Sequence, residues 1–71
     1  MTKSPTVLQE IEAKIKRTEL FKVMLSSGNY EDSGDVVDTI LDLRDRVRKG
    51  ENPEEVLHEE GFEPDYIYDL L

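Results

Sequence analysis

The chain has 71 residues, a net charge of −8 at pH 7 and no cysteine. This length supports one small domain over residues 1–71, and the lack of thiols excludes a disulfide framework and a thiolate metal site. No apolar run approaches the ~20 residues of a membrane span and nothing resembles a signal peptide, so we expect a cytoplasmic protein that does not enter membranes.

The charges are unevenly distributed along the chain. Residues 1–26 carry five basic and three acidic groups, whereas residues 27–71 carry four basic and fourteen acidic groups. The last 21 residues contain eight carboxylates and no Lys or Arg. Phosphates are repelled by such a surface, which disfavours nucleic acid and favours a protein partner with a basic surface. The alternative is that these carboxylates only keep an exposed face in water.

The first expected helix is long and runs from about residue 5 to residue 25 or 26. Ser4 and Pro5 suit its N-cap and first position. Its apolar residues form two stripes that point in different directions, namely Leu8, Ile11 and Ile15 before Thr18, and Leu20, Phe21 and Met24 after it. Either the helix bends or breaks near Thr18, or a second copy of the chain covers the second stripe. A homodimer of this kind would supply the core that so short a chain lacks.

Residues 27–48 predict a turn followed by an amphipathic helix on which the other segments pack. Ser27, Gly28 and Asn29 favour the turn, and Asp32 or Ser33 can cap the helix. The apolar stripe of this helix repeats at spacings of four, three and four, with Val36, Ile40, Leu43 and Val47. Basic residues gather at its C-terminal end, where the helix dipole favours them, and Gly50 is the expected stop.

Two short helices are predicted after Gly50. Asn52 and Pro53 suit the N-cap and first position of one helix, and Gly61 suits its end. The last helix begins near Pro64, and its apolar members are Tyr66, Ile67, Leu70 and Leu71. The predicted fold class is therefore all-α, a small bundle of four helices: one long N-terminal, one medium and two short C-terminal.

No residue pattern typical of an enzyme is present. His58 is the only imidazole, and its neighbours Glu59 and Glu60 do not provide a nucleophile or an oriented carboxylate. Residues 29–40 partly follow the pattern of a calcium loop, but Ile40 occupies the twelfth position, where a bidentate Glu is required. We therefore expect no catalytic residue, no cofactor and no metal.

Aromatic and acidic residues near the C-terminus are the candidates for partner binding. Tyrosine is favoured at interfaces because it combines a large apolar body with a polar tip. The alternative is that the aromatic side chains mainly fill the core. Tyr68 is the better candidate for binding, because Tyr66 is expected to face inward. The expected partner-binding residues are Tyr66, Tyr68, Leu71, Glu59, Glu60 and Asp65.

Residues 27–44 carry a resemblance to a known family. Ser27, Gly28, Tyr30, Asp35, Val36 and Val37 match in register. With the apolar helix that follows, this stretch resembles the turn and second helix of ribbon-helix-helix antitoxins of the ParD/CopG type. The resemblance implies a dimeric transcriptional repressor whose acidic C-terminal segment neutralises a basic toxin, and it implies a β-ribbon near residues 2–8. Ser4 and Pro5, which favour a helix, depart from that pattern.

A second stretch is similar to acyl carrier proteins, which are also short, acidic and four-helical. The segment Asp32-Ser33-Gly34-Asp35 resembles the start of their second helix, with Gly34 in the place of their Leu. This resemblance implies phosphopantetheine attachment at Ser33.

The leading hypothesis is a non-enzymatic, acidic protein interaction module, dimeric, that acts as a small regulator or adaptor. Its basis is the charge asymmetry, the small core and the missing catalytic pattern. The antitoxin-like regulator is the alternative, and the carrier protein is the third.

Overall fold

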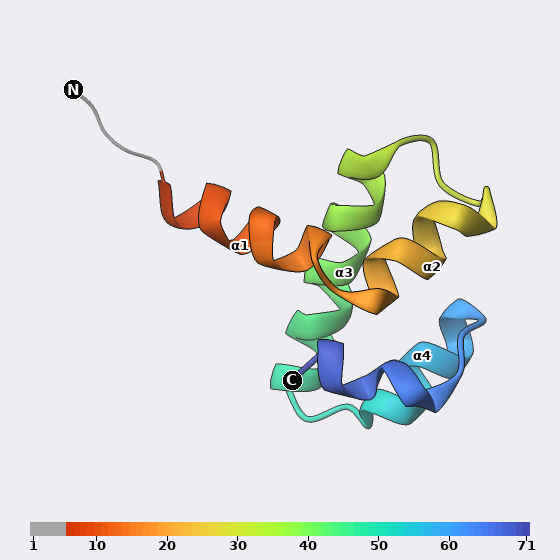
Figure 1. Ribbon diagram of the computed structural model, residues 1–71. Coiled ribbons are helices and arrows are strands. Elements are labelled where there is room, and N and C mark those ends of the chain that lie inside the picture. Colours follow the sequence, from red (N-terminus) through yellow and green to blue (C-terminus); the bar gives the residue numbers. More distant parts are fainter. Residues whose placement is uncertain (1–5) are drawn as a thin grey trace.

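A computed structural model describes residues 6–71, except for the side chains of residues 6 and 8. Within this range the chain is all helical and contains no strand. The helices are α1 (Thr6–Lys16), α2 (Glu19–Ser27), α3 (Ser33–Arg48), α4 (Pro53–Glu60) and the 3₁₀-helix η1 (Pro64–Asp69). Figure 1 shows α3 at the centre, with α1 projecting from one side and α4 and η1 below α2. The cap expected at Ser4 and Pro5 lies outside the described residues.

The prediction of one long first helix is wrong, because the helix breaks at Thr18. The Thr18 hydroxyl donates to the carbonyl oxygen of Ile15 at 2.6 Å and accepts from the amide nitrogen of Phe21 at 3.1 Å. One side chain therefore closes the end of α1 and caps the start of α2. Of the two alternatives left open by the sequence, the structure has the break, and residues 6–71 form five helices instead of four.

The break directs the apolar residues of both halves into one core. Leu20 and Met24 are fully buried and Phe21 is 7 % exposed, although the sequence assigned these three residues to a dimer interface. That assignment is corrected, because their side chains are already covered within a single chain. They share the core with the following buried residues: Ile15, Val36, Val37, Ile40, Leu43, Val56, Leu57 and Leu70.

The central helix α3 contacts α1, α2 and α4, as its apolar stripe predicted. Asp32 is its N-cap, and the Asp32 side chain accepts from the amide nitrogen of Asp35 at 2.9 Å. Gly50 follows the helix with a φ of 111°. The amide of Glu51 donates back to the carbonyl oxygen of Arg46 at 3.1 Å, which closes the end of the helix.

The C-terminal segment is part of the core. The Asn52 side chain caps α4, and the amide of Phe62 donates to the carbonyl oxygen of Leu57 at 2.9 Å in a Schellman closure around Gly61. The last helix is a 3₁₀-helix and not an α-helix; its i→i+3 bonds suit a segment of only six residues. Leu70 is buried, whereas Leu71 is 78 % exposed, so only the first of these two apolar residues packs in the core.

Candidate partner-binding surface

The outward side of α4 carries a concentration of carboxylates. Val56 and Leu57 point into the core, which directs the remaining side chains of the helix outward. A shallow hollow of about 390 Å³ lies on this side. We call it the acidic face, and its residues are Glu54, Glu55, His58, Glu59 and Pro64. Three of these five residues are glutamates, which carry a negative charge at neutral pH, so the surface attracts cations.

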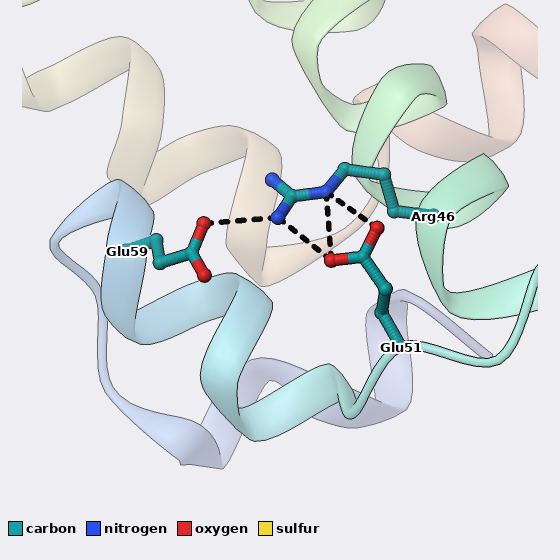
Figure 2. Close-up of polar contacts among 3 residues, drawn as sticks. All are labelled: Arg46, Glu51 and Glu59. Atoms are coloured by element: carbon teal, nitrogen blue, oxygen red, sulfur yellow. Dashed lines mark hydrogen bonds and ion pairs between the residues drawn. The ribbon is translucent and has the colours of Figure 1, made fainter.

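Arg46 of α3 fixes one border of the acidic face. Figure 2 shows its guanidinium between the carboxylates of Glu51 and Glu59. Nη2 of Arg46 donates to Oε1 of Glu51 at 2.8 Å and to Oε1 of Glu59 at 2.9 Å, and Nε donates to both oxygens of Glu51. The hydrogen bonds from Arg46 lower the pKa of Glu51 below its ordinary value. The predicted site residue Glu59 is thus exposed but partly neutralised.

Glu54 and Glu55 differ from Glu59 because no described residue forms an ion pair with them. Both side chains are exposed on the first turn of α4. Their charges are therefore available to a partner. Glu54 and Glu55 are not among the partner-binding residues expected from the sequence, although the helix pattern that buries Val56 and Leu57 already places them outside.

The predicted site residue Glu60 has a structural role. Its Oε2 accepts from the hydroxyl of Tyr30 at 2.8 Å, which connects the end of α4 to the turn before α3. Burial of the Tyr30 ring and the neighbouring Glu60 carboxylate raise the pKa of Tyr30 well above 10.0. Glu60 is consequently engaged within the fold and is not among the residues that line the acidic face.

The remaining predicted residues lie on η1 and after it. Tyr68 is 79 % exposed, and Asp65 is also exposed, whereas Tyr66 is half-buried against the core. Tyr68 is thus accessible, although none of these residues lines the hollow on α4.

Asp69 is an important residue that sequence reasoning missed. Its Oδ2 accepts from the amide nitrogen of Leu20 at 3.0 Å, and its carbonyl oxygen accepts from Nε of Arg44 at 3.1 Å. Asp69 therefore connects η1 to the first turn of α2 and to α3. Its partner Leu20 is 49 residues away in the sequence, so no local pattern indicates the contact.

The two resemblances concern other parts of the fold. The ribbon implied at residues 2–8 overlaps the start of α1 at residues 6–8, and residues 1–5 lie outside the described part. Ser33 is the first residue of α3 and is half-buried. Within residues 6–71, no three carboxylate or imidazole groups are close enough to share a metal ion.

None of the helices in the described range has both the length and the apolar character needed to cross a membrane. The chain matches no protein-family model, no curated protein and no solved structure.

Proposed function

We propose that this chain is a non-enzymatic interaction module that binds a basic surface of a partner protein through the acidic face of α4. The observation that carries the proposal is the pair Glu54 and Glu55, exposed beside a shallow hollow and without ion pairs among the described residues. Such charges accelerate encounter with an oppositely charged partner and select against acidic ones.

The fold holds this face in place. Asn52 caps the start of α4, Gly61 ends it, and Arg46 joins Glu59 to α3. Side chains on a capped and packed helix lose little further entropy on binding, which favours recognition without rearrangement. The hollow itself is lined by glutamates, His58 and Pro64, a set that offers charge and shape but no activated nucleophile.

A direct test must change the surface without changing the core. Removal of residues 51–71 is unsuitable, because it would delete the buried side chains of Val56, Leu57 and Leu70. Replacement of Glu54 and Glu55 by Lys reverses the charge of the acidic face and leaves the core intact. The matched control is the replacement of Asp38 and Asp42 by Lys, which makes the same change of net charge on exposed positions of α3.

The probe is a fluorescein-labelled peptide of about four helical turns, with leucine at every third or fourth position and lysine elsewhere. We expect the wild-type chain to bind it and the Glu54→Lys, Glu55→Lys variant to bind about tenfold more weakly in anisotropy titrations, since several exposed charge pairs are lost and reversed. Equal weakening by the control variant would show that only net charge matters and would contradict the proposal.

A further inference from the structure

A second surface of the molecule has the opposite charge. It consists of two adjoining hollows, which we call the arginine groove. One, of about 450 Å³, lies between α1 and α3; the other, of about 340 Å³, lies between α3 and the C-terminal residues. Arg44 and Arg48 line both hollows and are one helical turn apart, so they stand where the hollows meet.

The charges of the arginine groove are positive and largely uncompensated. Lys14 of α1 adds a third cation to Arg44 and Arg48. Among the described residues of the lining, Asp45 has the only acidic side chain, and its carboxylate already pairs with Nζ of Lys49 at 3.0 Å. No ion pair joins Lys14, Arg44 or Arg48 to any described carboxylate. In a chain with a net charge of −8, this is a local reversal of sign.

The arginine groove also presents apolar surface. Ile11 and Leu41 are half-buried in the first hollow, and Leu71 is 78 % exposed at the second. Apolar side chains left in contact with water beside charged rims are typical of surfaces that bind another protein. An occupant therefore needs both apolar groups and negative charge.

We infer that the arginine groove binds an acidic amphipathic helix of a partner protein. The apolar stripe of such a helix fits the two hollows, and its carboxylates meet the guanidinium groups of Arg44 and Arg48. Charge complementarity selects this occupant. A symmetric pairing with a second copy would bring Lys14, Arg44 and Arg48 against the same three cations, and nucleic acid is repelled by the acidic remainder of the chain. This surface and its partner are separate from those of the acidic face.

The test uses the leucine–glutamate counterpart of the peptide described above, in which every lysine is replaced by glutamate. The probed variant is Lys14→Glu with Arg48→Glu, and the matched control is Lys16→Glu with Lys22→Glu, two exposed lysines outside the groove. Arg44 is left unchanged because it also holds Asp69. We expect about tenfold weaker binding for the groove variant and less than a twofold change for the control at ~0.15 M salt.

Three further measurements make the inference falsifiable. A Lys14→Gln, Arg48→Gln variant, which adds no negative charge to the last turns of α1 and α3, is expected to weaken binding about threefold. The Glu54→Lys, Glu55→Lys variant is expected to bind the acidic peptide as the wild type does, which separates this inference from the proposed function. A peptide with serine in place of leucine is expected to bind at least tenfold more weakly.

Three results would overturn the inference. The first is no binding of the acidic peptide by the wild-type chain, and the second is equal weakening by groove and control variants. The third is that another ligand occupies the same residues in preference to the peptide. A second copy of the chain would do so if the wild type forms a dimer that the Lys14→Glu, Arg48→Glu substitutions dissociate, and duplex DNA would do so if it competes with the peptide at ~0.15 M salt.

Discussion

Replacement of Asp69 by Ala is expected to destabilise the whole domain, although Asp69 contributes no side chain to the core. The carboxylate of Asp69 accepts from the amide of Leu20, the second residue of α2, where helix amides otherwise lack a partner. Loss of a capping bond of this type costs ~1 kcal/mol, and loss of a negative charge near a helix N-terminus adds ~0.3–1 kcal/mol. We therefore expect a total loss of ~1–2 kcal/mol.

For a domain of this size, 1 kcal/mol corresponds to a Tm shift of roughly 4–8 °C, so Asp69→Ala is expected to melt about 5–15 °C below the wild type. Thermal unfolding followed by far-UV circular dichroism measures this shift. Asp69→Asn keeps an oxygen acceptor without the charge, and its Tm is expected to lie between those of the wild type and Asp69→Ala. The control is Asp65→Ala, an exposed position of η1. Equal Tm values for Asp69→Ala and Asp65→Ala would refute the role assigned to Asp69.

Three other predictions concern single side chains. Arg46→Met is expected to lower Tm at pH 7. Because Arg46 depresses the pKa of Glu51, the stabilisation from this ion pair is present above the ordinary pKa of 4.5 and is lost as pH falls through the depressed value. A Tm difference between variant and wild type that persists in acid would contradict this prediction. Tyr30→Phe is expected to cost about 1 kcal/mol in urea unfolding at pH 7. Since the native pKa of Tyr30 is raised, the wild type loses this extra stability as pH rises above 10.0. A stability difference between wild type and Tyr30→Phe that stays constant in alkali would contradict this prediction. Thr18→Ala is expected to lose ~1 kcal/mol, whereas Thr18→Ser, which keeps the hydroxyl, is expected to retain most of the stability; similar losses in both variants would exclude the cap as the cause.

The boundaries of α3 and α4 were predictable because their signals are local. Asp32 and Asn52 accept from amides two or three residues later, and Gly50 and Gly61 adopt the positive φ that ends a helix. Each of these signals lies within a few residues of the boundary that it marks. A single sequence therefore contains enough information to place them.

The break at Thr18 depends on the rest of the fold. Ile15 and Leu20 are both fully buried in one core, but five positions along a straight helix place them about 140° apart. One uninterrupted helix cannot direct both side chains to the same core. The sequence showed this conflict as two stripes, yet the choice between a break and a second copy required the positions of α3 and η1.

The candidate site was only partly predictable for a similar reason. The sequence indicated that the acidic C-terminal half is exposed, and Tyr68 does lie in water. Glu59 and Glu60 were both expected to bind a partner, but Arg46 binds Glu59 from 13 residues away and Tyr30 binds Glu60 from 30 residues away. Pairings at such separations arise from tertiary structure and leave no trace in local composition.

Helix geometry separates the arginines at the end of α3 onto two surfaces, although they form a single basic run in the sequence. Seen as a run, they suit the negative end of the helix dipole. In the helix, Arg44 and Arg48 differ by about 40° around the axis, whereas Arg46 lies about 200° from Arg44. Arg46 therefore faces Glu51 and Glu59, and the other two line the groove beside α1. Because the acidic face lies on α4 and is bordered by Arg46, which points to another side of α3 than Arg44 and Arg48, occupation of that face leaves Arg44 and Arg48 accessible. The Lys14→Glu, Arg48→Glu variant is accordingly expected to bind the basic peptide at least as tightly as the wild type does, and weaker binding would show that the two sites overlap.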